Sequence, residues 1–414
     1  MINSEKPLNV ADLLRPTYRR NRLYYNRESN MIENSFSFLG RYISGELYKG
    51  WDLFDGLNSQ LLKKSCFYEF KFLRMFWMQF FKRSPINFRK LAKVPKDYNA
   101  KGLGLFASGL IFAGLIDKAG QLLNLLRQMV CSGYKDNCWG YNFDWQARAF
   151  YVPVGKPNIV TTVFVANAFL DYFEKTDDTS ALAAGIGACN FILDNLILFE
   201  DNNTLCFGYI PGEIARVHNA NMLGAALLGR VYSYDGTAVY YEKSRKAIAY
   251  SVDALRPDYS WPYGERHHHR FVDNFHTGFN LVALKEWMGF VDKWQWEDEL
   301  TKAYQYYLDT LFLADGRPKY YSNSLFPIDI HCSAQGMITC LKLEKYSERS
   351  LATARKIAEW AILNMQDKKG FFYYQKTKFF TNKISYMRWS QAWMYYALSY
   401  YIRKLSGRDE MCEA

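Results

Sequence analysis

The chain has 414 residues, of which 49% are apolar and 18% aromatic; this excludes an intrinsically disordered protein and allows a large buried core. Its net charge of +11 fits an acidic partner, such as nucleic acid, anionic lipid or acidic polysaccharide, or equally a basic surface without a special partner. No nucleic-acid-binding motif accompanies the basic positions, so we expect no nucleic-acid partner.

The chain begins with a polar, arginine-rich stretch, residues 1–28, which we expect to form an arm over the surface. It lacks the basic region followed by an apolar run that marks a secretory signal. The longest uncharged apolar run, residues 102–116, is too short to span a bilayer. The eight cysteines form no CxxC pair, and most lie in apolar segments, which is typical of reduced core cysteines. We therefore expect a cytoplasmic protein with no integral membrane segment.

Two kinds of helical segment alternate from residue 29, where the first helix is expected over residues 29–45. One kind is almost wholly apolar, at residues 103–116, 163–172, 222–232 and 392–401. The other carries its charges on one stripe, at residues 117–130, 238–255, 294–311 and 347–364. A helix that is apolar all round is buried, and a helix with a charged stripe has one wet face. The alternation therefore predicts inner helices paired with outer helices.

Polar clusters recur about every 57 residues, each at the start of an inner helix. They begin at Thr161, His218, Asp273, His331 and Arg388, and the same spacing reaches back to Gly104 and Trp51. A fixed period indicates one supersecondary unit used repeatedly. We predict an all-α fold, a single α/α toroid of antiparallel helical hairpins over residues 29–406, with a polar tail at 407–414. Six hairpins are expected, or seven if a short inner helix lies near residue 52.

The loops that lead into the inner helices combine glycine or proline with aromatic residues, as in Trp261-Pro262-Tyr263-Gly264. Such a composition indicates tight turns or short hairpins. In a toroid these loops all open on the same face. We therefore expect them to surround one central cavity together with the starts of the inner helices.

Four residues of these clusters are candidates for acid–base catalysis: Asp273, Glu265, His218 and His276. Glycoside chemistry needs one protonated and one ionised carboxyl group, and histidine titrates near neutral pH. Each candidate also has a structural interpretation. Asp273 is a good N-cap for the next inner helix, and each histidine could cap its own helix or bind a neighbouring loop.

The same clusters supply candidates for binding a sugar. The polar ones are Asn219, Asn221, Asn274, Asn280, Asp144, His331, Gln335 and Gln391, and the aromatic ones are Trp145, Trp261, Tyr263 and Trp389. Aromatic rings stack on the apolar faces of sugars, although ordinary packing explains any one ring equally well. Arg388 would suit a carboxylate or phosphate of the ligand. Its alternative is a buried ion pair with Asp273 or Glu265.

A metal site is suggested by the run His267-His268-His269 with Asp273 and His276 beyond it. The Pro-Tyr-Gly turn just upstream favours a helix that starts at residue 273, so these side chains would not share one helical face. We predict no metal. We also expect no cofactor, because no phosphate-binding loop, dinucleotide fingerprint or nucleophile elbow occurs.

Five segments resemble a bacterial family found with polysaccharide gene clusters, the VpsJ-like polysaccharide biosynthesis proteins. They are residues 51–59 (WDLFDGLNS), 217–224 (VHNANMLG), 261–265 (WPYGE), 272–280 (VDNFHTGFN) and 387–393 (MRWSQAW). The resemblance covers most of residues 45–400 and implies a toroid of the six-hairpin glycosidase type, whose relatives include unsaturated glucuronyl hydrolases, sugar 2-epimerases and polysaccharide lyases. Some members are labelled delta-aminolevulinic acid dehydratase, an enzyme that is a β/α barrel; this chain has no strand–helix alternation.

These observations favour a carbohydrate-active enzyme of bacterial polysaccharide metabolism. It would act on an anionic sugar or oligosaccharide in the central cavity by hydrolysis, elimination or epimerisation. The alternative is a noncatalytic glycan-binding or assembly factor that uses the same cavity. An isoprenoid-type cyclase is disfavoured because the predicted cavity is polar and rich in histidine and asparagine.

Overall fold

The computed structural model describes residues 22–146 and 151–407, with side chains described from residue 30 onward. The first helix, α1 (Arg22–Gly45), begins earlier than the expected residue 29. The rest of the expected arm and all but the first residue of the expected tail lie outside the described residues.

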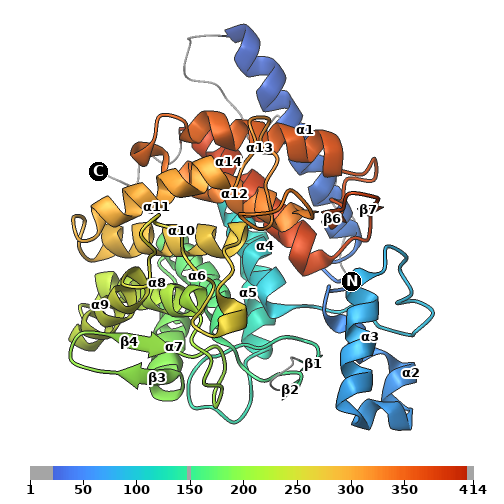
Figure 1. The fold of residues 1–414 in the computed structure, drawn as a ribbon, viewed down its shortest axis with the longest axis horizontal. Coiled ribbons are helices and arrows are strands. Elements are labelled where there is room, and N and C mark those ends of the chain that lie inside the picture. The colour runs from blue at the N-terminus through green and yellow to red at the C-terminus, as the bar shows by residue number, and fades with distance from the viewer. Residues whose placement is uncertain (1–21, 147–150, 408–414) are drawn as a thin grey trace.

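Six inner helices form a closed ring: α4 (Ala100–Phe112), α6 (Ile159–Thr176), α8 (His218–Asp235), α10 (Asn274–Phe290), α12 (Ile330–Lys342) and α14 (Trp393–Leu405). Each packs against the next, and α14 packs against α4 (Figure 1). The outer partners are α5 (Ile116–Gln128), α7 (Thr179–Asn195), α9 (Ala238–Val252), α11 (Glu297–Thr310) and α13 (Ser350–Met365). Helix α1 packs on α14 and completes the sixth hairpin. The predicted α/α toroid is confirmed, and within the described residues it has six hairpins.

No seventh inner helix forms near residue 52, so the seven-hairpin alternative is wrong. The chain between α1 and α4 folds into short helices: η2 (Asp55–Asn58), α2 (Gln60–Lys63), η3 (Cys66–Glu69) and α3 (Lys71–Arg83). The Phe54 amide donates to the Asp52 carboxylate two residues earlier, over 3.1 Å. This local bond competes with helix formation and holds the chain in a turn. Helices α2 and α3 project beside the ring, at the lower right of Figure 1.

The polar residues at the starts of the inner helices explain where those helices begin. Asn99, Asn158, Asp273 and Asp329 are N-caps, and each side chain accepts a hydrogen bond from an amide of the first turn. Small residues then let the inner helices approach closely. A Cβ added at Gly104 of α4 would lie 3.0 Å from the Phe164 carbonyl oxygen of α6. The recurring clusters are therefore partly structural.

The loops that lead into the inner helices contain short antiparallel strands. These are β1 (Trp145–Gln146), β2 (Tyr151–Val152), β3 (Ile197–Glu200), β4 (Leu205–Phe207), β5 (Ile328–Asp329), β6 (Gln375–Lys376) and β7 (Thr381–Asn382). Strands β1 and β2 pair together, β3 pairs with β4, and β6 pairs with both β5 and β7. The third sheet links the start of α12 to the next loop along the chain. It therefore fixes two neighbouring cavity loops against each other.

The seven cysteines that lie in the described part of the chain are unpaired, and all except Cys66 are buried. Every helix of residues 22–146 and 151–407 is too short or too polar to cross a bilayer.

A buried network of charges joins the start of the chain between α1 and α4, which we call the extra segment, to the π-helix η6 (Met387–Ala392) that leads into α14. The Arg388 guanidinium donates twice to the Asp52 carboxylate, over 2.6 and 2.7 Å. Arg89 donates to Asp55 over 2.7 Å and to the Asp52 carbonyl over 2.8 Å. All four residues are at most 3% exposed. Because charges are costly to bury, each partner depends on the other to remain in the core.

We predict that Asp52→Asn lowers the free energy of unfolding by about 3 kcal/mol, because it leaves the Arg388 charge buried without its counter-ion. Urea unfolding followed by tryptophan fluorescence measures this change. The control is Glu359→Gln, which breaks an exposed pair with Arg355 on α13 and should cost less than about 1 kcal/mol. Equal losses in the two variants would contradict the prediction.

Candidate active site

A cavity of about 1190 Å³ opens where the inner helices begin. All six inner-helix units contribute to its wall, through Lys101, Val160, Asn219, His276, His331 and Arg388 among others. Helix α3 closes one side with Met75, Met78, Gln79, Lys82 and Arg83. The volume exceeds the range of about 300–1,000 Å³ that is typical of small-ligand pockets. It has room for a disaccharide or a longer glycan.

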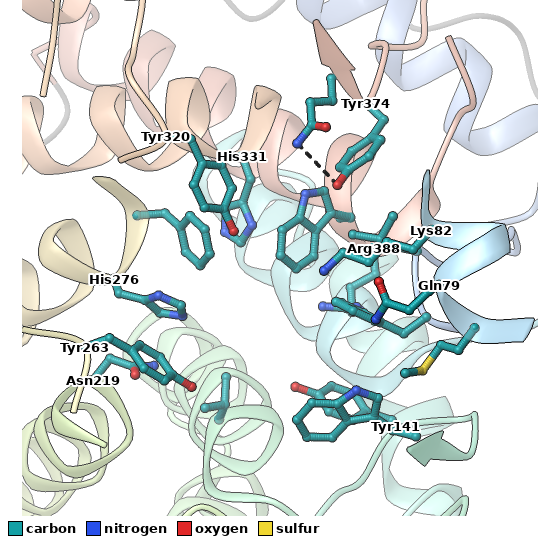
Figure 2. A pocket seen from close by; sticks show the side chains of 18 of the residues that line it. Gln79, Lys82, Tyr141, Asn219, Tyr263, His276, Tyr320, His331, Tyr374 and Arg388 are labelled. Atoms are coloured by element: carbon teal, nitrogen blue, oxygen red, sulfur yellow. Dashed lines mark hydrogen bonds between the residues drawn. The ribbon is translucent and has the colours of Figure 1, made fainter. Parts of the chain in front are cut away.

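Seven of the residues predicted from the sequence line this cavity together: Trp145, Asn219, Tyr263, His276, His331, Arg388 and Trp389. Figure 2 shows Asn219, Tyr263 and His276 on one side of the cavity, with Gln79 and Lys82 of α3 on the other side. Residues that are far apart in the sequence thus meet because each begins, or precedes, an inner helix.

The remaining predicted residues lie outside the cavity lining, and most have structural partners. Asn221 accepts from the Phe207 amide and donates to the Ala247 carbonyl. Gln391 likewise accepts a hydrogen bond from the Phe372 amide and donates one to the Phe372 carbonyl. In the buried core, Asn274 donates a hydrogen bond to the Leu311 carbonyl, Gln335 to the Thr339 hydroxyl, and Trp261 to the Ser251 carbonyl. Asn280 is also buried, and its Oδ1 has no hydrogen-bond partner among the described residues.

Three of the predicted acidic or basic residues are also turned away from the cavity. Glu265 has a side chain that is 45% exposed, and it contacts Arg216 and Tyr250. His218 is buried 3.3 Å from the Ser251 hydroxyl, and burial lowers the pKa of its imidazole to about 4. Asp144 accepts from the Tyr68 hydroxyl and pairs with Lys63 at 3.1 Å. It therefore ties the extra segment to the ring.

His276 is oriented by Asp273. One oxygen of this carboxylate caps α10 through the His276 amide, and the other lies 2.7 Å from His276 Nδ1. Asp273 is 2% exposed and does not line the cavity, whereas His276 does. With Nδ1 committed to the carboxylate, Nε2 is the nitrogen left to exchange a proton with a ligand. Asp273 thus acts through His276.

His331 has a different environment, made of aromatic rings. Its imidazole stacks on Phe275 at 4.5 Å, with 16° between the planes, and lies 4.5 Å from Trp393. Neither ring nitrogen has a hydrogen-bond partner among the described residues. Burial holds the pKa of His331 well below its ordinary value, and the nearby charges of Lys101 and Arg388 lower it further. His331 is therefore held as a neutral imidazole.

Lys101 is a buried amine in the cavity wall that the sequence analysis did not identify. It lies in the first turn of α4, 3% exposed, with Nζ 4.4 Å from the centre of the Phe164 ring and 5.1 Å from that of Trp393. No carboxylate pairs with it in the described part of the chain. Burial and then the charge of Arg388 hold the pKa of Lys101 well below its ordinary value. In the sequence, Lys101 is distinguished only by its positive charge at the start of an otherwise apolar inner helix.

The charges that line the cavity are mostly positive. Arg388 is offset by Asp52 rather than by the expected Asp273 or Glu265. Arg266 pairs with Glu213 at 2.8 Å, and Glu213 is the one carboxylate among the described lining residues. Lys82 and Arg83 of α3 line the cavity with Lys101, and among the described residues none of the three has an ion-pair partner. An anionic ligand would complement this wall.

His268 and His269 lie at the cavity wall in a short helix, η4 (His267–His269). Over residues 22–146 and 151–407, no three histidine, cysteine, aspartate or glutamate side chains are grouped so as to hold a metal ion.

No protein-family model matches the chain, and no curated protein does. A sugar epimerase from a ruminal bacterium has a similar structure, with a TM-score of 0.60, 14% identity and coverage of 76% of this chain and 90% of the epimerase. Cellobiose 2-epimerase from Bacillus thermoamylovorans aligns with a TM-score of 0.59 and 11% identity, over 76% of this chain and 90% of the enzyme. The GH76 α-mannanase of Bacteroides thetaiotaomicron aligns with a TM-score of 0.57 and 12% identity, over 76% and 87%. At these identities the similarity establishes the fold alone, a toroid of six α/α hairpins.

The buried carboxyl group of Asp329 should make stability depend on pH. It accepts from the His331 amide and from Trp389 Nε1, and burial raises its pKa from 3.8 to about 7. A raised pKa in the folded state contributes stability at low pH that is lost as the pH rises toward 7. We predict that Asp329→Asn gains stability relative to the natural protein over this range, by about 1.4 kcal/mol for each unit of pKa difference at most.

Thermal or urea unfolding of both proteins between about pH 4 and pH 8 measures this gain. The matched control is Asp298→Asn, in which the replaced side chain is 69% exposed. Because water screens an exposed carboxylate, the difference between this control and the natural protein should vary much less with pH. A constant difference for Asp329→Asn would contradict the assignment.

Proposed function

We propose that this protein is a carbohydrate-active enzyme that moves a proton at a carbon next to a carbonyl or carboxylate group of a sugar, most simply an epimerase. The proposal is supported by the titratable side chains that line the cavity. Four histidines line the cavity, of which His276 and His331 belong to inner helices, and its one described carboxylate, Glu213, is paired with Arg266. Such a wall suits proton transfer by histidine.

Hydrolysis of a glycosidic bond is less well supported, since most glycosidases need two carboxyl groups on either side of that bond. Glu265 and Asp273, the best carboxylates in the sequence, do not line the cavity. Asp273 instead binds His276. This leaves epimerisation and β-elimination, which both begin when a base removes a proton from carbon.

The two histidines suit different parts of such a reaction. His331 is neutral among aromatic rings and would take the proton from the sugar carbon. His276 is oriented by Asp273, which binds Nδ1 and leaves Nε2 to return a proton from another direction. Both imidazoles contact the ring of Phe275, with ring centres 4.1 and 4.5 Å away. They are thus close enough to act on one ligand.

The positive wall supports an anionic substrate. Burial lowers the pKa of Lys101 and of Lys82, and a bound carboxylate would favour their protonated forms. Together with Arg83 they would bind a carboxylate of a sugar acid and stabilise the negative charge that develops when carbon loses its proton. The aromatic lining, which includes Tyr141, Trp145 and Trp389, would stack on the apolar faces of the sugar rings.

The comparisons and the sequence resemblance support a sugar-converting activity in polysaccharide metabolism. Sugar epimerases are among the proteins with a similar fold. The resemblance to VpsJ-like proteins supports a role in bacterial polysaccharide metabolism, and we propose that the protein works in the cytoplasm.

Exchange with heavy water tests the proposal. We expect the protein, incubated in D₂O with a panel of reducing sugars and sugar acids, to incorporate deuterium at one carbon of its substrate, as detected by NMR. His331→Asn and His276→Asn should each slow this exchange by about 10²- to 10⁴-fold. The control is His267→Asn, because His267 is exposed and does not line the cavity; its exchange rate should be unchanged.

The other outcomes identify the other functions. New reducing ends without deuterium exchange would show hydrolysis and contradict the proposal. An unsaturated product that absorbs in the ultraviolet would assign elimination. Saturable glycan binding with no exchange and no product would favour the noncatalytic binding role.

A further inference from the structure

The positive charge of this protein is concentrated in one short part of the chain. Residues 60–96, called the basic aromatic segment below, contain ten lysines and arginines but one acidic residue, Glu69. The segment therefore carries a net charge of +9 out of +11 for the whole chain. It comprises α2, η3, α3 and the loop that follows α3.

The same segment exposes an unusual amount of apolar surface. Nine of the 22 exposed large apolar side chains in the described part of the chain belong to it: Leu61, Phe67, Phe70, Phe72, Leu73, Phe76, Phe80, Ile86 and Leu91. Phe72 is 80% exposed and Phe76 is 68% exposed. Single exposed apolar residues are common, but a concentration of this kind marks an interaction surface.

Helix α3 has two faces, one exposed to solvent and one that lines the cavity. Phe72, Phe76 and Phe80 follow each other at intervals of four residues, so they share the outer face of the helix. Met75, Met78 and Lys82 line the cavity from the other side. Trp77 donates from Nε1 to the Gly56 carbonyl over 3.0 Å, which fixes the helix to η2. The phenylalanine face is thus held outward on an anchored helix.

We infer that the basic aromatic segment docks the protein on an anionic membrane surface. Helices that lie in a bilayer interface insert aromatic and aliphatic side chains between the headgroups, while neighbouring lysines and arginines bind anionic lipids. Interfaces between proteins are instead depleted of lysine. The exposed lysines at positions 63, 64, 71, 90 and 93 therefore favour a lipid surface over a second copy of this chain or another protein.

Docking by this segment would place the cavity mouth beside the bilayer, because α3 contributes to both surfaces. The inference does not depend on the proposed reaction, since membrane binding is measured without any sugar.

Co-sedimentation of the full-length protein with lipid vesicles tests the inference. We expect binding to vesicles that contain phosphatidylglycerol, much weaker binding to phosphatidylcholine alone, and release by added salt. Phe72→Ser combined with Phe76→Ser should abolish binding. Lys64→Ala combined with Lys71→Ala should weaken binding to the anionic vesicles about 30-fold. These four side chains are exposed, so the variants should keep the natural circular dichroism and melting temperature.

The matched control combines Trp294→Ser with Leu363→Ser. These side chains are 76% and 74% exposed but lie outside the segment, so their loss should leave binding unchanged. The inference is overturned if the protein ignores anionic vesicles, or if the control loses binding as the Phe72 and Phe76 variant does. It is also overturned if sedimentation velocity finds a dimer that this phenylalanine variant dissolves while vesicles remain unbound.

Discussion

The pairing of Arg388 with Asp52 in the buried core is the contact on which the arrangement of the cavity depends. The first and last helices of the toroid, α1 and α14, are far apart in the sequence, and the extra segment leaves the toroid between α1 and α4. The ion pair fastens the start of that segment to η6, which leads into the last inner helix, and the Met387 amide adds a bond of 2.9 Å to the Trp51 carbonyl. Because α3 belongs to the same segment, this network also positions the wall that carries Lys82 and the face that carries Phe72.

The same pairing decides which charges remain for a ligand. Asp52 offsets Arg388, so the basic side chains of the cavity wall that lack an ion-pair partner among the described residues are Lys82, Arg83 and Lys101. The two histidines differ for an equally local reason. His276 has a carboxylate at 2.7 Å, whereas His331 has aromatic rings on its faces. The cavity therefore offers two imidazoles in different environments, one oriented by a carboxylate and one held neutral by burial.

The repeat in the sequence predicted the ring because N-caps and cavity residues both occur where an inner helix begins. It could not predict which neighbour points inward, because successive residues of a helix are turned by about 100°. His218 therefore faces Ser251, while Asn219 lines the cavity. Asn221 and Gln391 looked like sugar-binding residues but hold loop backbones. Lys101 was overlooked because it lies in an apolar helix, and α3 because it lies outside the repeat.

The central claim is that this cavity holds an anionic sugar between its lysines and its two histidines. A crystal structure with a bound hexuronic acid tests that claim most directly. The account predicts the carboxylate within hydrogen-bond distance of Lys101 or Lys82 Nζ, with a carbon of the sugar between His276 and His331. A sugar bound outside the cavity, or with its carboxylate directed away from these lysines, would contradict it.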